Sequence, residues 1–422
     1  MIPTPSSPLS SSTWSEAMKS SLLPLDEALA ALLQRAQPIA DIETVATADA
    51  LDRFLAADLI STLDVPPLDN AEMDGYAVRA ADLGSGVALP VAQRVAAGHP
   101  GDQLEPGTCA RIFTGAPIPA GADAVVMQEQ AQVLADGVVF QHVPKPGEWV
   151  RRRGEDIRAG AAILLAGTRL GPQHCGLAAA VGLATVPVVR RPRVACFFTG
   201  DELAMPGEVL RPGAIYNSNR FVLVDLLRRL GCEVTDLGNV ADSLSATRAA
   251  LRAAAAESDL VITSGGVSVG EEDHVRAAVA AEGEIDLWRV AIKPGKPLAC
   301  GRVRRVDGSS AQLIGLPGNP VSSFVTFALF VRPFVLRLAG ATGVAPKAVA
   351  LRADFDWPAS GVRREFLRAR INPDGGLELF DHQGSGVLTS LVWADGLVDN
   401  PPGQAIARGA TVRFLPFSDL TN

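Results

Sequence analysis

The sequence has few cysteines, no excess of basic residues and no long hydrophobic run. Its 422 residues include five cysteines, an odd number without a Cys-x-x-Cys pair, which argues against a disulfide framework and a structural zinc site. We expect most of these cysteines to lie in the core. The net charge is -8, so the dominant basic field of a nucleic-acid-binding protein is missing and no nucleic-acid partner is expected.

Membrane and secretion signals are also missing. The longest apolar stretch, Cys175–Val189, contains Pro187 and is shorter than the roughly 18 residues that span a bilayer, so we interpret it as a buried segment. The N-terminal stretch MIPTPSSPLSSSTW is rich in Ser and Pro and has no apolar core behind a basic start, unlike a secretory signal. We expect residues 1–20 to form a disordered tail, and the protein to be cytoplasmic and to make no membrane contact.

The length predicts about three domains, and the texture of the sequence changes along the chain. Helical spacing of apolar residues occurs in Leu25–Leu33 and in Asp49–Ala57, each behind an acidic residue. From Pro66 onward, short β-prone runs are broken by Gly and Pro, and Asp136-Gly137 in VLADGVVF predicts a hairpin.

From Arg193 the chain alternates apolar, β-prone runs with helical patterns, which predicts an α/β domain with a mostly parallel sheet covered on both faces. Beyond Ala341 short strands and turn signals return, so a small C-terminal β domain is expected. The predicted division is a linking segment at 21–60 and 150–190, a β-rich domain at 61–149, an α/β domain at 191–340 and a β domain at 341–422.

Glycine- or charge-bearing loops follow four of the predicted strands of the α/β domain. They are Thr199–Glu202, Ser264–Ser268, Lys293–Lys296 and Leu316–Pro320. Ligands of open α/β sheets bind outside the carboxyl ends of the strands, so four such loops at one edge predict a site there.

The loop TSGGVSVGEEDH combines an anion cradle with acidic residues. Gly265 and Gly266 allow backbone N–H groups to approach a phosphate, and Ser264 and Ser268 can donate hydrogen bonds. The alternative is a plain strand-to-helix turn, in which Ser268 or the acids Glu271–Asp273 cap the next helix.

The charged side chains of two other loops also allow two interpretations each. Lys293 and Lys296 flank a Pro-Gly turn and suit an oxyanion, although a solvated surface turn has the same pattern. Glu202 follows an apolar strand and is either a metal ligand or a helix cap. In the β-rich module, Asp74-Gly75 and Thr114-Gly115 taken separately read as a turn and a strand end.

Seven motifs together resemble the molybdopterin molybdenumtransferases, the family of MoeA and the gephyrin E domain. They are DNAEMDGYAVR, IFTGAPIPAGADAVV, RRRGEDI, FTGDEL, SGGVSVGEEDH, IKPGKP and LPGNPVSS, and they occur in the family's order from about Leu22 to the C-terminus. The resemblance implies an α/β domain similar to molybdopterin adenylyltransferases and a homodimer whose cleft is shared between subunits. It also implies insertion of molybdate into adenylylated molybdopterin, with hydrolysis of the phosphoanhydride, release of AMP and help from Mg2+ or another divalent cation.

The resemblance also implies roles for individual residues. Carboxylates able to hold the divalent cation or position reacting groups are Glu202, Asp242 and Asp273. The pterin nucleotide is assigned to Ser264, Gly265, Gly266, Ser268, Pro317, Gly318, Asn319 and Pro320, and molybdate to Lys293, Lys296, Ser322, Arg363 and Ser385. Polar positions presented by the β-rich half, from the other subunit, are Asp74, Thr114 and Asp156.

Two other functions compete with this one. A molybdopterin adenylyltransferase shares the α/β domain but needs neither the β-rich module nor the C-terminal domain. A gephyrin-like scaffold carries an additional adenylyltransferase domain and a long linker, which this sequence lacks. The adenylyltransferase is also a candidate protein partner.

Overall fold

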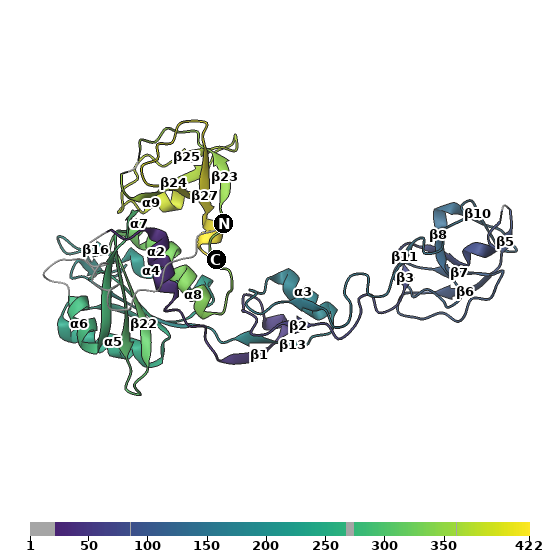
Figure 1. The fold of residues 1–422 in the computed structure, drawn as a ribbon, viewed down its shortest axis with the longest axis horizontal. Coiled ribbons are helices and arrows are strands. Elements are labelled where there is room, and N and C mark those ends of the chain that lie inside the picture. Colours follow the sequence, from purple (N-terminus) through teal and green to yellow (C-terminus); the bar gives the residue numbers. More distant parts are fainter. Residues whose placement is uncertain (1–21, 85, 267–273, 360) are drawn as a thin grey trace, which may run out of the picture. The chain divides into compact units, whose positions relative to one another are not determined.

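The computed structural model describes residues 22–84, 86–266, 274–359 and 361–422 (Figure 1). The chain divides into two compact units. The larger contains residues 22–43, Asp52–Phe54 and the described part of Val188–Asn422, and the smaller contains the described part of Thr44–Leu51 and Leu55–Pro187.

A six-stranded sheet forms the centre of the larger unit. Its strand order is β17-β14-β18-β22-β21-β19, in which the first four strands are parallel and the last two run antiparallel to their neighbours. The bounds are β14 Arg193–Thr199, β17 Glu233–Val240, β18 Leu260–Ser264, β19 Gly283–Arg289, β21 Pro297–Arg304 and β22 Ser310–Leu316. The predicted α/β fold with a mostly parallel sheet is confirmed.

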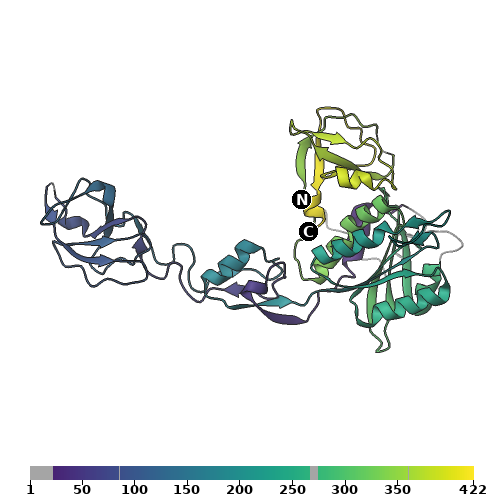
Figure 2. The same ribbon diagram turned by 180° about the vertical axis from the view of Figure 1, so that it is seen from behind.

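Side chains of β14 alternate between two hydrophobic clusters, one on each face of this sheet. Val194, Cys196 and Phe198 belong to one cluster, and Ala195 and Phe197 to the other. Helices cover both faces, as Figures 1 and 2 show. One layer holds α5 (Leu244–Glu257) and α6 (His274–Glu282); the other holds α2 (Leu25–Leu33), α4 (Ser218–Arg229), α7 (Pro320–Thr326) and α8 (Arg332–Leu338).

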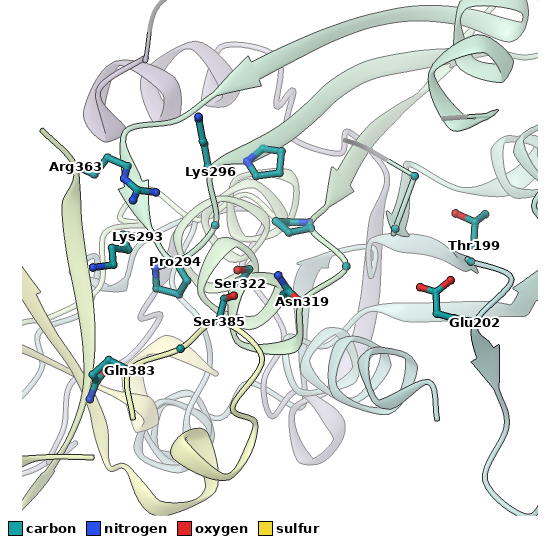
Figure 3. Close-up of a pocket in the computed structure, with 18 of the residues that line it drawn as sticks. Thr199, Glu202, Lys293, Pro294, Lys296, Asn319, Ser322, Arg363, Gln383 and Ser385 are labelled. Atoms are coloured by element: carbon teal, nitrogen blue, oxygen red, sulfur yellow. The ribbon is translucent and has the colours of Figure 1, made fainter. Parts of the chain in front are cut away.

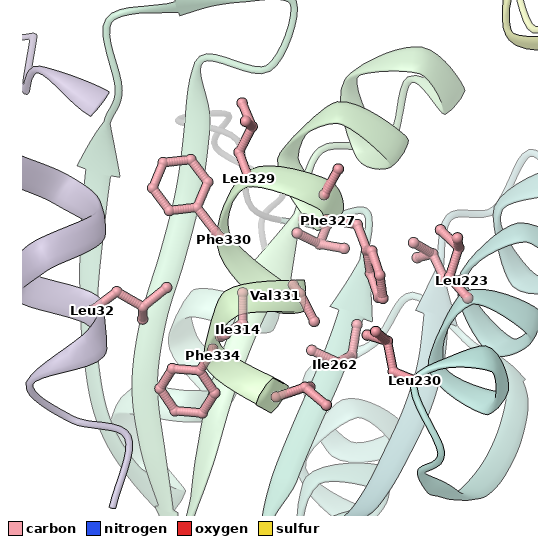
Figure 4. Packing of buried hydrophobic residues seen from close by; sticks show 14 of the residues in the cluster. Leu32, Leu223, Leu230, Ile262, Ile314, Phe327, Leu329, Phe330, Val331 and Phe334 are labelled. Atoms are coloured by element: carbon pink, nitrogen blue, oxygen red, sulfur yellow. The ribbon is translucent and has the colours of Figure 1, made fainter. Parts of the chain in front are cut away.

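A long apolar helical stretch fills the larger of these clusters. It runs through α7, a π-helical turn η4 (Phe327–Val331) and α8, and Figure 4 shows Phe327, Phe330 and Phe334 packed beside Ile262 and Ile314. Among the described residues it is the one helix long and apolar enough to cross a membrane, but 94% of it is buried inside the protein. That burial is what a core helix requires.

The C-terminal part of the larger unit is a second six-stranded sheet with the order β20-β24-β26-β27-β23, to which β25 adds by pairing with β24. The strands are β20 Ile292–Lys293, β23 Val349–Arg352, β24 Arg364–Ile371, β25 Leu377–Leu379, β26 Gly396–Asn400 and β27 Thr411–Pro416, with α9 Thr389–Trp393 and α10 Phe417–Leu420. Strand β20 comes from the chain between β19 and β21, so the lysine loop of the α/β domain is hydrogen-bonded to this sheet.

The smaller unit is mostly β-structure. A four-stranded sheet has the order β6-β7-β4-β8, and a three-stranded sheet has the order β5-β10-β9. The bounds are β4 Gly75–Val78, β5 Ala88–Leu89, β6 Val91–Val95, β7 Cys109–Ile112, β8 Ala124–Met127, β9 Ala131–Val133 and β10 Val138–Phe140. Strands β9 and β10 pair with Val138 opposite Val133, which confirms the hairpin predicted at Asp136-Gly137.

Three short strand pairs and one helix lie mostly in the same unit. The two-stranded pairs are β1-β13, β2-β12 and β3-β11, and the helix is α3. Their bounds are β1 Ile42–Ala46, β2 Leu59–Ile60, β3 Asn70–Ala71, β11 Val150–Arg151, β12 Ala162–Leu164, β13 Thr185–Val189 and α3 Pro172–Ala180.

Two local predictions were wrong. Asp49–Ala57 is not a helix: the 3-10 turn Thr47–Asp49 ends there, and Asp52 has φ 62°. The backbone N–H of Leu55 instead donates to the carbonyl of Thr168, so long-range bonds replace helical ones. Cys175–Val189 is not one buried segment either, because it is split between α3 and β13 and most of the α3 part is partly or fully exposed.

Candidate active site

A cavity of about 640 Å³ lies at the carboxyl ends of the parallel strands of the larger unit. All four loops singled out in the sequence line it, together with residues from loops beside the C-terminal sheet. The lining residues are Thr199, Gly200, Glu202, Asp242, Gly265, Gly266, Lys293–Pro297, Pro317–Asn319, Ser322, Arg363 and Gln383–Ser385. Because parallel strands end at one edge, loops far apart in sequence meet there.

The glycine loop after β18 approaches the strand beside it closely. Gly265 has φ 94° and Gly266 has φ 63°, in the left-handed region that favours glycine. A Cβ added at Gly265 would lie 2.3 Å from the carbonyl oxygen of Thr199, so this position has no room for a side chain. The loop therefore presents bare backbone to the cavity, the surface that a phosphate group requires.

Ser264 has a different part in this loop from the ligand contact first considered. Its hydroxyl is buried, donates to the carbonyl oxygen of Pro317 at 3.1 Å, and accepts a hydrogen bond from Asn219 at 3.0 Å. Asn219 also donates to the carbonyl of Gly318 at 2.7 Å. Ser264 and Asn219 thus tie the glycine loop to the Pro317–Asn319 loop. Ser268, the other hydroxyl considered, lies outside the described residues.

Three cationic side chains gather on one side of the cavity. Lys293, Lys296 and Arg363 lie there in Figure 3. The ammonium group of Lys293 contacts Oε1 of Glu365 at 2.8 Å, and the other oxygen of Glu365 accepts from the indole N–H of Trp357 at 2.7 Å. Glu365 was not singled out in the sequence, since no local motif links it to a lysine 72 residues away.

Carboxylates line the cavity as well. Glu202 lies with Thr199 on the side away from the cations in Figure 3, and Asp242 is also part of the lining. Within the described ranges no group of three or more His, Cys, Asp or Glu residues is arranged to hold a metal ion, and Asp273 lies outside those ranges. Two carboxylates beside an anion cradle fit Mg2+, which binds through one or two carboxylates, substrate phosphates and water.

A loop that follows β25 of the C-terminal sheet supplies the remaining wall. Ser385 lines the cavity with Gln383 and Gly384, and its carbonyl accepts the backbone N–H of Val321 in α7 at 3.0 Å. Gln383 and Gly384 were missed in the sequence because they belong to no recognisable motif. Pro320 is the first residue of α7, where its missing N–H costs no helical bond, and it is not part of the lining.

The remaining predicted site residues belong to the smaller unit. Oδ1 of Asp74 accepts hydrogen bonds from the backbone N–H of Thr114 at 2.7 Å and from its hydroxyl at 2.8 Å. These bonds lower the pKa of Asp74, so it is ionised at neutral pH. The two motifs that read as a turn and a strand end when taken separately form one polar pair. Asp156 is exposed, and its backbone N–H donates to Val65.

Comparison with known proteins covers nearly the whole chain. Residues 23–182 match the MoeA N-terminal region (domains I and II), residues 195–337 a probable molybdopterin binding domain, and residues 350–417 the MoeA C-terminal region (domain IV). A molybdopterin molybdenumtransferase of Haemophilus influenzae is 39% identical over 408 residues, which are 94% of this chain and 100% of that protein. The chain belongs to the MoeA family.

Other members of the MoeA family agree with this assignment. A molybdopterin molybdenumtransferase of Bacillus subtilis is 34% identical over 411 residues, which cover 93% of this chain and 94% of the relative. The crystal structure of the molybdopterin biosynthesis MoeA protein of Pyrococcus horikoshii superposes with a TM-score of 0.81 at 30% identity, covering 94% of this chain and 100% of that one. Membership gives this protein a role in molybdenum cofactor biosynthesis and the activity class of a transferase.

Proposed function

We propose that this protein inserts molybdate into adenylylated molybdopterin, hydrolysing the phosphoanhydride and releasing AMP. One observation carries the proposal: a single cavity is lined by a bare-backbone anion cradle, by the cations Lys293, Lys296 and Arg363, and by the carboxylates of Glu202 and Asp242. A site for an anion alone would avoid carboxylates, whereas a site for a metal-assisted anhydride cleavage needs both.

Each group of residues has a task in this proposal. The backbone of Gly265 and Gly266 holds the phosphate end of the nucleotide, and the loop Pro317–Asn319 holds the remainder. Lys293, Lys296, Arg363, Ser322 and Ser385 bind molybdate, because a tetrahedral dianion suits several converging donors. Glu202 and Asp242, with Asp273, would hold Mg2+ or another divalent cation, which offsets phosphate charge when bound.

An adenylyltransferase is the competing activity. Part of the cavity wall comes from Arg363 and Gln383–Ser385, which lie in loops next to strands of the C-terminal sheet, and an adenylyltransferase needs no C-terminal domain of this kind. This wall favours the molybdenum transfer.

The two activities are separated by incubating the purified protein with adenylylated molybdopterin, molybdate and Mg2+. We expect release of AMP together with metal insertion, and no adenylylated product from molybdopterin and ATP. Production of the adenylylated species from ATP would instead assign the protein to the competing activity.

Substituting the lysine loop tests the residue assignment. Lys296→Ala should reduce molybdate-dependent AMP release by roughly tenfold to a hundredfold, the usual cost of one hydrogen bond to a charged group. Lys347→Ala, an exposed lysine outside the cavity, is the matched control and should retain full activity. Equal rates for both variants would exclude Lys296 from the molybdate site.

The quaternary state and the compartment complete the proposal. We propose a homodimer in which Asp74, Thr114 and Asp156 of one subunit serve the cleft of the other, with the molybdopterin adenylyltransferase as the partner that delivers the substrate. The hydrogen-bonded pair of Asp74 and Thr114 supports a polar, substrate-facing surface on the smaller unit.

The state of the cysteines supports a compartment. All five cysteines are free thiols, in keeping with a reducing compartment such as the cytoplasm.

A further inference from the structure

A buried arginine lies behind the wall of the cavity. Arg368, in the middle of β24, is 1% exposed and is the largest fully buried side chain of the described residues. Lys and Arg side chains are almost never fully buried unless a carboxylate is paired with them. Within the described part of the chain, Arg368 takes part in no ion pair, and its guanidinium bonds only to neutral groups.

Those neutral groups connect Arg368 to the cavity. Nη2 donates to the carbonyl of Gly384 at 3.1 Å, Nη1 to the carbonyl of Phe366 at 3.2 Å, and Nε to the hydroxyl of Ser390 at 3.2 Å. Gly384 itself lines the cavity. The buried charge is therefore one peptide group away from the cavity surface.

The backbone of Arg368 holds the same loop from its other side. Its N–H donates to Oε1 of Gln383 at 2.9 Å, and its carbonyl accepts from Nε2 of Gln383 at 3.0 Å and from the N–H of Phe380 at 3.1 Å. Gln383 and Gly384 are thus bound to Arg368 through both its main chain and its side chain. A rigid strand in this way fixes a loop that carries the lining residue Ser385.

Among the described residues, no carboxylate pairs with Arg368 to cancel its charge. Glu365, three residues earlier in β24, uses its carboxylate on Lys293 and Trp357. Burial lowers the pKa of Arg368 to about 10, still well above neutral, so the guanidinium is charged. In a low-dielectric interior an uncompensated cation acts over a longer distance than it does in water.

We propose that Arg368 is a positioning residue for the oxyanion: it fixes the Gln383–Ser385 loop and places an unpaired positive charge behind the part of the cavity that takes a dianion. The inference rests on the proposed function for the identity of that dianion. Arg368 would thus contribute positive charge to the site although it does not line the cavity. The charge of Lys293, in contrast, is offset by Glu365, so Lys293 attracts the oxyanion less than its position in the lining indicates.

The test measures the dissociation constant of molybdate by titration calorimetry on the full chain, at constant ionic strength. Arg368→Met removes the charge and the fork and should weaken binding about tenfold or more, because a buried charge close to the ligand is lost. Arg368→Lys keeps the charge and should lose only a few-fold. Arg370→Met, on the same strand but exposed and paired with Glu378, is the control and should bind like wild type.

A second variant separates charge from loop position. Ser390→Asp places a carboxylate beside Nε of Arg368, which keeps the guanidinium in place while cancelling its charge. Molybdate binding should weaken, although the melting temperature should show a folded protein. Ser390→Asp also tests the role of the charge if Arg368→Met does not fold.

The outcomes are distinct. If wild type binds no molybdate, the proposed function is wrong, and the inference that rests on it is wrong as well. If wild type binds and both Ser390→Asp and Arg368→Met bind within twofold of it, the positioning role of Arg368 is wrong. If Arg368→Lys and Arg368→Met lose the same affinity for molybdate, the loss comes from the loop contacts of Arg368 alone, and the proposed role of its charge is wrong.

Discussion

At the scale of single residues, the contact between Lys293 and Glu365 defines the cationic side of the cavity. Glu365 is 4% exposed, and each of its two carboxylate oxygens accepts a hydrogen bond, one from Lys293 and the other from Trp357. Burying a carboxylate without such partners would cost several kcal/mol. The pair is therefore a precondition for placing a lysine loop against this sheet.

The same pair predicts how stability depends on pH. Burial by itself raises the pKa of Glu365, but hydrogen bonds from Lys293 and Trp357 and the charge of Lys293 lower it, and the net direction is downward. A carboxyl group whose pKa is depressed by folding stabilises the fold above its unfolded pKa of about 4.3 and loses that contribution as pH falls below it. Glu365→Gln should thus flatten the fall in melting temperature between about pH 5 and 3.

Melting curves of wild type and Glu365→Gln across this range measure the effect. Glu378→Gln is the matched control, because its exposed ion pair with Arg370 should contribute little. If Glu365→Gln and wild type lose melting temperature in parallel, the hydrogen bonds to Glu365 are not what lowers its pKa.

The cations of this site were predictable from the sequence, but the groups that hold the lysine and its neighbouring loops in place were not. Lys293 and Lys296 stand beside a recognisable Pro-Gly turn. Glu365, Asn219 and Arg368 have no local signature, because each acts on a residue that is remote in the chain or separated by a loop. Partners of this kind become visible only when strands have been paired.

At the scale of elements, the ends of β14 and β18 lie so close that the loop between β18 and α6 tolerates glycine alone at its start. A Cβ at Gly265 would overlap the carbonyl of Thr199, and φ 94° is unfavourable for any other residue. Gly265→Ala should therefore move the loop, reduce AMP release by about tenfold or more and lower stability by about 1 to 3 kcal/mol.

The rate of AMP release and the free energy of unfolding are measured together for Gly265→Ala. Gly343→Ala is the control, since an added Cβ there meets no atom within 4 Å and the residue lies outside the cavity. Wild-type kinetics in Gly265→Ala would mean that the backbone of this loop does not touch the nucleotide.

Elements with a strong local signal were predicted well. Leu25–Leu33 is a helix with the expected bounds, and the hairpin at Asp136-Gly137 forms as its turn residues require. Asp49–Ala57 has helical spacing too, but its backbone groups bond to remote parts of the chain. Short segments follow their local preference only where no tertiary partner offers better hydrogen bonds.

At the scale of the whole molecule, the proposed sharing of the cleft between two subunits can be tested by complementation. Asp74→Asn and Lys296→Ala chains, carrying different tags, are co-expressed and the mixed dimer is purified through both tags. If each cleft combines one subunit's Lys296 with the other's Asp74, one cleft of the mixed dimer is intact, and about half of the wild-type activity should return.

Each variant purified as its own homodimer provides the reference for this measurement and should be far less active than wild type, with Lys296→Ala slower by roughly tenfold to a hundredfold. A mixed dimer no more active than these references would mean that Asp74 and Lys296 serve a cleft within one chain. A chain that sediments as a monomer would remove the shared cleft altogether.

Periodicity, turn chemistry and long motifs are local properties of a chain, so the classes of element, the α/β character of the central domain and the family were predictable before folding was considered. Which of the predicted site residues face the cavity depends on the fold. The Ser264 side chain is buried and holds a neighbouring loop, whereas Gln383 and Gly384 line the cavity. The direction in which a side chain points is set by strand pairing and by the need to pair buried hydrogen-bonding groups. The unpaired charge of Arg368 likewise exists only where the folded chain encloses it.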